Sequence, residues 1–505
     1  MSSVEAGGSI EKMIQSTTVV AISTFLAVAC TSTNGGRVFD TVILGGRVMD
    51  PATRLDAVRN VGIAGGSVAS ITSADIVGHD TVDAAGLVVA PGFVDLHAHG
   101  QDSVSNRLQA LDGVTTALEM EIGVYPVGAW LASREGHSLI NYGATVSHPG
   151  ARVKLLTGVD IGHFAVLPPS GEGMRIWSGK HIYTSLTDGQ IGELSRLVGN
   201  GLDEGALGIG FGITYTPGAS RTEVLRMFQL AAMRDVPAYV HLRGANSGGV
   251  LGAFQEVIAD AASTGASVHI VHMNSSAGEV APVALEMIRG ARERGLDVTT
   301  EAYPYTASST LIESALFDSW EGLDDTAYAR LQWAGTTERL TSSTFRKYRR
   351  LGGWVVIHGR KEETNEWIVS QPDVMVASDG IPFLYVAAHP RGAGTFSRVL
   401  GHYVRERGAL TLMQALAKMT VLPARRLQGA APEMRLKGRI QAGMDADMTI
   451  FDPETVIDAA GYDNPDAPSR GVEFVMVGGT LLVREGRLLS GVFPGRAIRG
   501  GGGAH

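Results

Sequence analysis

The sequence predicts an α/β protein: an eight-stranded parallel (β/α)8 barrel (TIM barrel) with a small β-sandwich built from both chain ends. Three observations favour this fold class. The 505 residues suffice for one large domain and a smaller one. Strand-like apolar runs alternate with helix-like stretches from 91 to 430, as in repeated βα units. Short β-type runs with glycine turns fill 40–90 and 431–505.

The barrel segment shows this alternation most clearly between residues 236 and 305. The run "VPAYVHLRG" predicts a strand, "GVLGAFQEVIADAASTG" a helix, "SVHIVHMN" a strand and "APVALEMIRGARERG" a helix. The length of the segment suits eight such units. In this fold the reactive side chains lie at the carboxyl ends of the strands, so polar residues there are the first candidates for a site.

The first 39 residues are typical of a targeting segment rather than of folded structure. Residues 1–30 contain an uncharged apolar stretch that ends in "AVAC", small residues followed by Cys30. This pattern resembles a bacterial lipoprotein signal, in which Cys30 would be lipidated and 31–39 would form a tether; a buried helix and an ordinary signal peptide are the alternatives. We therefore expect an exported, periplasmic protein whose only membrane contact is an N-terminal lipid anchor.

Composition excludes two classes of protein. The formal net charge is −9, and no block of lysine or arginine stands out, so nucleic acid is not an expected partner. The chain has one cysteine, which excludes a disulfide framework. The expected partner is a small molecule, and the sequence does not indicate an oligomeric state.

Two histidines follow the apolar run "PGFVDLHAHG" with one residue between them. Because side chains alternate along a strand, Asp95, His97 and His99 share one face. Two neutral imidazoles on one face at a strand end can bind one cation. The pattern indicates a metal site in the mouth of the barrel.

Three later strands also end in candidate metal ligands. His241 closes "VPAYVHLRG" and Asp379 precedes the glycine of "ASDG". In "SVHIVHMN", His272 shares a face with Asn274, whereas His269 lies on the opposite face and is interpreted as structural.

Two glutamates interrupt the otherwise apolar strand "TTALEMEIG". Glu119 and Glu121 share a face, and burying both carboxylates is costly unless each is paired or binds metal. A carboxylate can bridge two cations. Glu121, nearer the strand end, is the favoured bridging ligand, and Glu119 is expected to orient a histidine or to take the bridging role instead.

Together these motifs resemble the amidohydrolase superfamily and, within it, the N-acyl-D-amino-acid deacylase (D-aminoacylase) family. The resemblance covers most of the chain after the tether and includes "PGFVDLHAHG", "GALGIGFGITYTPG", "EAYPYTASST", "ASDG" and "HPRGAGTFSRVLGHYVRE". It implies metal ligands at His97, His99, His241, His272 and Asp379, with Asp379 also the general base, and Arg391 with Tyr303 or Tyr305 gripping a substrate carboxylate.

The sequence departs from the family pattern at two positions. "MEIG" stands where the family usually has a cysteine ligand, so the chain resembles the members that use a carboxylate bridge. One or two divalent ions are expected, zinc first, with manganese or iron as alternatives because the bridge is a hard oxygen ligand. Asn274 replaces a lysine that often reaches the substrate carboxylate in the family. It is a candidate substrate-binding residue, but it brings no positive charge, which leaves Arg391 as the main partner expected for an anion.

The expected function is hydrolysis of a linear amide by metal-activated water, with an N-acyl-(D-)amino acid as the first candidate substrate. A cyclic amidase of the hydantoinase or dihydropyrimidinase kind and a dipeptidase are the enzymatic alternatives. The non-enzymatic alternative is a substrate-binding lipoprotein on an inactive hydrolase scaffold.

Overall fold

A computed structural model describes residues 37–163, 177–244, 249–384 and 389–501 of the chain. The predictions for the signal segment, for Cys30 and for most of the tether fall outside these residues. The chain from Val38 onward forms one unit, which contains all the elements below. Within the described residues, no helix combines the length and the apolar character needed to cross a membrane.

The centre of the fold is a sheet of eight parallel strands, and the barrel prediction is confirmed. The strands follow one another in chain order: β6 (Phe93–Asp95), β7 (Val114–Val124), β8 (Asn141–Ser147), β9 (Ile209–Gly212), β10 (Ala238–His241), β11 (Val268–Ile270), β12 (Val298–Ala302) and β16 (Val374–Val376). Just past the two outer strands, Ala98 pairs with Gly380, and the Gly100 amide donates to the Gly380 carbonyl at 2.7 Å. These bonds nearly close the barrel.

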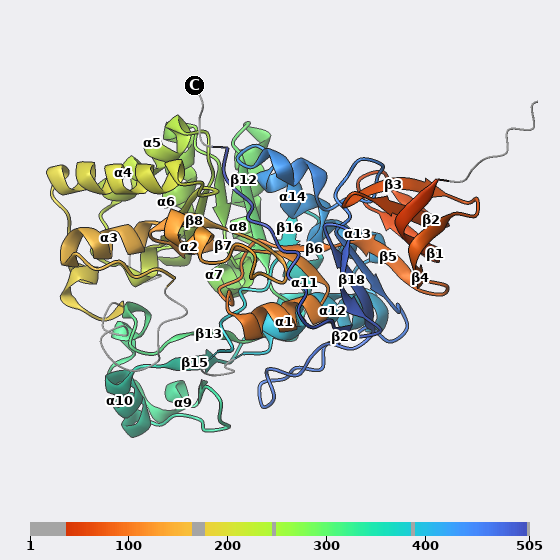
Figure 1. Cartoon of the computed structure of the whole chain (residues 1–505). Helices are drawn as coiled ribbons and strands as arrows, with labels where there is room; N and C mark the ends of the chain where they lie inside the picture. The colour runs from red at the N-terminus through yellow and green to blue at the C-terminus, as the bar shows by residue number, and fades with distance from the viewer. Residues whose placement is uncertain (1–36, 164–176, 245–248, 385–388, 502–505) are drawn as a thin grey trace, which may run out of the picture. The chain divides into compact units, whose positions relative to one another are not determined.

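Helices connect and surround these strands, as Figure 1 shows for α3 to α6. Their bounds are α1 (Ser103–Leu111), α2 (Val127–Ala132), α3 (His148–Thr157), α4 (Asp188–Asp203), α5 (Arg221–Met233), α6 (Gly249–Thr264), α7 (Met273–Ala277), α8 (Ala281–Glu293), α11 (Glu362–Ser370), α12 (Arg391–Arg398), α13 (Leu412–Met419) and α14 (Val421–Leu427). A π-helical segment, η8 (Val399–Glu406), continues α12. Short 3-10 turns complete the connections: η3 (Lys180–Tyr183), η4 (Ile213–Tyr215), η6 (Gly278–Val280) and η9 (Pro432–Leu436).

Local sequence explains where these helices begin and end. The Thr187 hydroxyl caps α4 by accepting a hydrogen bond from the backbone N–H of Gln190. In return, the side-chain oxygen of Gln190 accepts a hydrogen bond from the backbone N–H of Thr187. The Ser147 hydroxyl caps α3 by accepting the Gly150 backbone amide at 2.9 Å, and α3 ends at Gly158, whose φ of 79° favours glycine. Such caps satisfy amide groups that have no partner within the helix.

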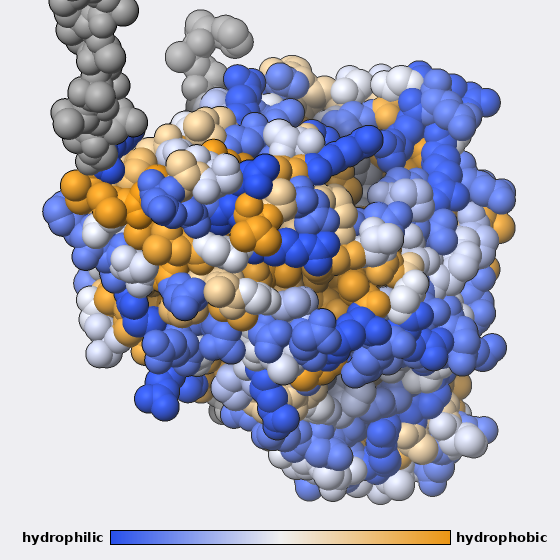
Figure 2. Space-filling view, turned by 90° about the vertical axis from the view of Figure 1, so that its right-hand side faces the viewer, coloured by the Kyte–Doolittle hydropathy of each residue, from blue (hydrophilic) through white to orange (hydrophobic). Residues whose placement is uncertain are grey.

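Strands from both ends of the chain form a second sheet of nine strands. They are β1 (Val38–Asp50), β2 (Leu55–Ala64), β3 (Ser67–Thr72), β4 (Val77–Asp83), β5 (Val88–Pro91), β17 (Met448–Phe451), β18 (Val472–Val477), β19 (Thr480–Arg484) and β20 (Arg487–Leu488). The two ends join where β17 runs antiparallel to β5. Figure 2 views this side of the molecule, where apolar residues interrupt the hydrophilic surface; exposed valines on these strands include Val38, Val58 and Val77. The predicted domain boundaries stay predictions.

A third sheet, which the sequence did not lead us to expect, lies between β12 and β16 in the chain. Its strands are β13 (Ser308–Leu311), β14 (Leu331–Trp333) and β15 (Trp354–Ile357), with helices η7 (Ala315–Trp320), α9 (Asp325–Tyr328) and α10 (Ser342–Leu351) beside them. Phe317, Tyr328 and Phe345 are among the residues of its own apolar core. We call residues 308–357 the insert lobe; it contributes a wall to the cavity over the metal centre.

Candidate metal centre

The donor residues predicted from the strand ends lie together at the carboxyl end of the barrel. His97 and His99 follow β6, Glu121 lies near the end of β7, and His241 is the last residue of β10. His272 and Asp379 follow β11 and β16 and have positive φ angles of 36° and 51°. A positive φ is costly for these residues, and such backbone strain concentrates at functional sites.

Glu121 lies between two pairs of histidines. Its Oε2 atom is 3.4 Å from Nε2 of His97 and 3.1 Å from Nε2 of His99. Its Oε1 atom is 2.8 Å from Nδ1 of His241 and 2.8 Å from Nε2 of His272. Two groups of metal-ligand atoms therefore share one carboxylate, which is the arrangement of a bridged two-ion site.

Two further carboxylates fix the orientation of the first histidine pair. Glu301 lies 3.0 Å from Nδ1 of His97 and also accepts the His272 amide at 2.7 Å. Glu119 lies 2.8 Å from Nδ1 of His99. Each carboxylate holds the Nδ1 proton of its histidine and leaves Nε2 as a bare electron-pair donor.

These contacts show that the residues fit a cation. Nε2 of His97 and Nε2 of His99 are 3.1 Å apart, although both Nδ1 atoms already face carboxylates. In the neutral tautomer that these carboxylates favour, both Nε2 atoms and an oxygen of Glu121 point at one another with electron pairs only. Only a positive charge between them makes such a grouping favourable, and imidazole with carboxylate is a donor set for zinc and related divalent ions.

The electrostatics of the centre agree with this interpretation. Burial alone would lower the pKa of His97, but the carboxylates of Asp379, Glu121 and Glu301 raise it well above the usual value. Burial would raise the pKa of Glu121, yet the imidazoles of His97 and His241 hold it well below its usual range. The site attracts positive charge strongly, whether as protons or as metal ions.

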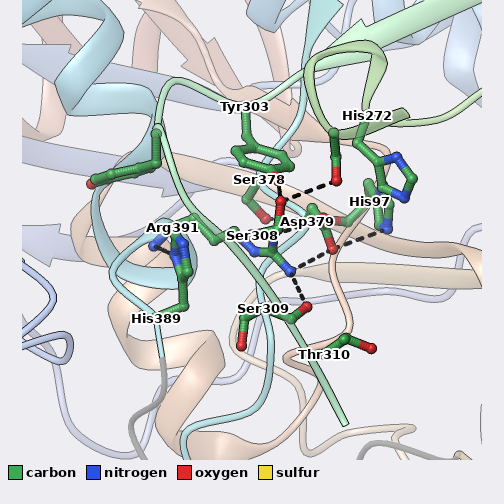
Figure 3. Close-up of polar contacts among 12 residues, drawn as sticks. His97, His272, Tyr303, Ser308, Ser309, Thr310, Ser378, Asp379, His389 and Arg391 are labelled. Atoms are coloured by element: carbon green, nitrogen blue, oxygen red, sulfur yellow. Dashed lines mark hydrogen bonds and ion pairs between the residues drawn. The ribbon is translucent and has the colours of Figure 1, made fainter. Parts of the chain in front are cut away.

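Asp379 adjoins both the histidines and an arginine. Its Oδ1 atom is 3.4 Å from Nε2 of His97, and its two oxygens lie 2.9 and 2.8 Å from Nη2 and Nη1 of Arg391. Figure 3 shows Arg391 reaching Asp379 and the Ser309 carbonyl, with His97 on the other side of Asp379. Burial opposes ionisation of Asp379, but Arg391 and His97 lower its pKa well below the usual value.

This pairing differs from the role expected for Arg391. The family resemblance assigned its guanidinium to a substrate carboxylate, whereas the structure pairs it with Asp379. His389 supports the arrangement, because its Nδ1 accepts the Arg391 amide at 3.1 Å while its Nε2 contacts the Ala307 carbonyl at 3.0 Å. A substrate-binding role for Arg391 stays a prediction.

The other expected substrate-binding residues also have partners within the protein. The Tyr305 hydroxyl donates to Asp458 at 2.9 Å, and Tyr305 does not line the cavity, so the geometry does not favour the role expected for it. The buried Asn274 donates to the Tyr303 carbonyl and to Asn365, each at 2.8 Å. It therefore supports the backbone of Tyr303, whose own hydroxyl lies 2.9 Å from the Ser308 hydroxyl.

A cavity of about 700 Å³ opens over the centre. Its floor includes Glu121, His241, His272 and Asp379, and the insert lobe contributes residues such as Trp354 to its wall. The volume is within the range typical of small-molecule sites.

Sequence reasoning missed two residues next to the centre. Glu301 is a buried carboxylate on β12, in "TTEAYPY", but the two threonines before it remove the apolar context that had identified Glu119 and Glu121. His163 was given no role, but its Nε2 lies 2.7 Å from Glu119. His163 lies outside any strand, so alternation of side chains gave no signal for it. The buried His269, by contrast, contacts Thr299 at 2.8 Å, in keeping with the structural interpretation.

A parallel barrel with histidines and carboxylates gathered at its carboxyl end defines a metal-dependent barrel hydrolase. A profile described as "Amidohydrolase family" matches residues 80–154. An N-acyl-D-glutamate deacylase of Alcaligenes xylosoxydans xylosoxydans is 31% identical over 89% of this chain and 96% of its own length. A D-aminoacylase of the same organism is 27% identical over 91% and 97%.

Solved structures agree with these sequence matches. N-acyl-D-glutamate deacylase from Bordetella bronchiseptica, crystallised with zinc and a phosphonate inhibitor, is similar with a TM-score of 0.77 and 27% identity over 92% of this chain and all of that one. A D-aminoacylase crystal structure has a TM-score of 0.75 at 24% identity over 91% of this chain and all of that one, a likeness of fold. The chain belongs to the N-acyl-D-amino-acid deacylase family of the amidohydrolase superfamily.

Proposed function

We propose that this protein is a metal-dependent hydrolase that removes the acyl group from an N-acyl-D-amino acid. The observation that carries the proposal is the position of Glu121 between two histidine pairs on the floor of a cavity of about 700 Å³. The activities of the relatives supply the substrate class, and the D configuration comes from them alone.

The chain's own residues divide into two sets of ligands for divalent ions. His97, His99 and Glu121 would hold one ion, and Glu121, His241 and His272 a second. Zinc is the first candidate, because the similar Bordetella enzyme was crystallised with it. A divalent ion in such a site lowers the pKa of water from about 15.7 toward 7 and polarises a carbonyl oxygen.

Asp379 is placed to move the proton of the reaction. Its Oδ1 atom lies 3.4 and 3.5 Å from the ligand nitrogens of His97 and His99, so it faces the same space as the metal ligands. Arg391 keeps Asp379 ionised, so Oδ1 has an electron pair free to accept a proton from water and to return it to the leaving nitrogen. Because the same pairing makes Asp379 a weak base, this transfer would need a bound divalent ion that lowers the pKa of the water.

Metal removal and return test the proposal. Chelation should abolish turnover of N-acetyl-D-amino acids, and zinc should restore it. The Asp379→Asn variant should keep bound metal and lose turnover by at least about 100-fold, since general-base catalysis is worth that much. Glu454→Gln, an exposed substitution after β17 in the second sheet, is the control. Full activity after exhaustive chelation would contradict the proposal.

A substrate panel separates the alternatives. It should include N-acetyl-D- and N-acetyl-L-amino acids, dipeptides, a hydantoin and dihydrouracil. Turnover of the two cyclic compounds alone would replace deacylation by cyclic amidase activity. Failure to retain any divalent ion after purification would favour the binding lipoprotein.

We also propose that residues 1–30 direct export and that Cys30 carries a lipid which anchors the protein in the periplasm. The support is the sequence pattern alone, an apolar stretch that ends in "AVAC". Residues 31–39 would then link the anchored cysteine to the folded part.

A further inference from the structure

One corner of the cavity is built from hydroxyl groups around a single guanidinium. Nη2 of Arg360 donates to the Ser308 hydroxyl at 2.8 Å and approaches the Tyr303 hydroxyl at 3.4 Å. Ser308 also lies 3.0 Å from the Ser275 hydroxyl. Arg360, Ser308 and Ser275 all line the cavity. We call these three residues with Tyr303 the Arg360 corner.

The charge of Arg360 is not neutralised by a carboxylate. Among the arginines that line the cavity, Arg391 is paired with Asp379 at 2.8 Å, and Arg243 with Glu256 at 2.8 Å. Within the described part of the chain, no carboxylate lies within 4 Å of Arg360 or Arg330. Arg360 is half-buried, so leaving its charge uncompensated is costly unless a ligand supplies the negative group.

The surroundings favour Arg360 over Arg330 as the partner of an anion. Arg330 is exposed, donates to the His358 carbonyl at 3.2 Å and lies beside the Trp320 ring. Among the residues that the structure describes, no hydroxyl group accepts a hydrogen bond from it. Arg360, by contrast, is held by the Tyr305 carbonyl at 3.0 Å and is flanked by hydroxyls, which act as further donors to a carboxylate.

The corner lies close to the reacting centre. The guanidinium carbons of Arg360 and Arg391 lie 5.4 and 4.8 Å from the centre of the Tyr303 ring. Arg391 in turn holds Asp379. Both guanidinium groups therefore lie against the same aromatic ring, which places Arg360 near the arginine that holds the proposed base.

We infer that the Arg360 corner binds the carboxylate of the substrate and so selects acylated amino acids over neutral amides. The inference rests on the proposed function and deepens it. It assigns to Arg360 the role that Asn274 cannot take for lack of a charge and that Arg391 does not take while paired with Asp379. Ser308 and Ser275 supply hydroxyl donors, and Tyr303 supports the guanidinium with its ring face.

Kinetics with matched substrates test the inference. The metal-loaded wild type should prefer N-acetyl-D-methionine over N-acetyl-D-methioninamide, its neutral analogue, by on the order of 100-fold in kcat/KM, as expected for a lost charge-assisted contact. In Arg360→Gln, kcat/KM for the acid should fall by about 100-fold, mainly because KM rises, whereas kcat/KM for the amide should change little. The preference for the acid should therefore disappear. Arg360→Lys should restore part of it. Arg330→Gln is the matched control and should keep the preference.

Equilibrium binding separates this inference from the proposed function. The two compounds are titrated by calorimetry into metal-free protein, in which Asp379 stays paired with Arg391, with and without Arg360→Gln. If the acid binds more tightly than the amide and Arg360→Gln removes the difference, the Arg360 corner is supported. If neither compound is hydrolysed, only the proposed deacylation is contradicted. Any of four results would overturn the inference. Arg360→Gln could lose kcat/KM equally on the acid and the amide, or it could keep the wild-type preference for the acid. Arg330→Gln could lose that preference instead, or the acid could fail to bind.

Discussion

Asp379 and Arg391 form a two-pronged ion pair beside the four histidines, with Oδ2–Nη1 and Oδ1–Nη2 distances of 2.8 and 2.9 Å. The side chain of Arg391 is 1% exposed and that of Asp379 9%, so neither charge is screened well by water. The pair also directs Oδ1 of Asp379 toward Nε2 of His97. Arg391 is thus a positioning residue for the proposed base.

Removing the arginine should leave a buried carboxylate without its partner. We expect Arg391→Met to lower the free energy of unfolding of the metal-free protein by roughly 3–5 kcal/mol, the cost of breaking a buried pair. Arg391→Lys should lose less, because it keeps the charge but not the two-pronged geometry. Denaturant unfolding measures both.

The control is an ion pair of similar length on the surface. Arg407 lies 2.6 Å from Glu366 and is 47% exposed. Arg407→Met should cost far less than Arg391→Met, because water screens an exposed ion pair. A similar loss for Arg391→Met would show that Asp379 does not depend on Arg391.

Glu121 and Glu119 should respond differently to loss of charge. Glu121 touches both histidine pairs, so Glu121→Gln should reduce the number of zinc ions retained per chain. Glu119 contacts His99 through Nδ1, so Glu119→Gln should keep the same stoichiometry and weaken affinity by roughly 10- to 100-fold. Elemental analysis and zinc titration distinguish the two. Full zinc retention by Glu121→Gln would exclude it as the bridge.

Much of the centre could be predicted from the sequence, because most of its residues lie on strands or directly after them. Alternation of side chains brought His97 and His99 to one face, and the cost of burying two carboxylates identified Glu119 and Glu121. The barrel fold then implied that His241, His272 and Asp379 meet these residues at the carboxyl end of the barrel. The structure places these residues within contact of one another.

The remainder depends on where the chain leaves the strand. His272 has a φ of 36° and directly precedes α7, so Asn274 lies on a helix and the alternation that had placed it beside His272 no longer applies. The partners of Arg391 and Tyr305 are distant in sequence or set by loop geometry, which no local pattern encodes. The insert lobe was missed because its strands are only three or four residues long, too short to show a clear period in the sequence.

Replacing Cys30 tests the proposed lipid anchor. Cys30→Ser should move the protein from the membrane pellet to the soluble fraction after cell lysis, because one lipidated residue would be its only anchor. Immunoblots of the separated fractions measure this. An unchanged distribution of wild type and variant would remove the support for lipidation.

Glu313, in the insert lobe, should make the stability of the protein depend on pH. Its Oε2 atom accepts the Gly353 amide at 3.0 Å, while Oε1 is buried without a hydrogen-bond partner among the described residues. Burial raises its pKa from 4.5 to about 7. Between these values the folded state keeps a proton that the unfolded state has lost. This contribution is therefore fully present below pH 4.5 and is lost as the pH rises through 7.

Glu313→Gln should remove this dependence, since the amide keeps the shape and an oxygen acceptor but does not titrate. The free energy of unfolding of the variant, minus that of the wild type, should rise by about 2–3 kcal/mol between pH 5 and pH 8. Denaturant unfolding at both pH values measures it, with the exposed Glu454→Gln as the control. If the difference stays constant, Glu313 is ionised in the folded protein at both pH values, and its buried oxygen must have a cationic partner.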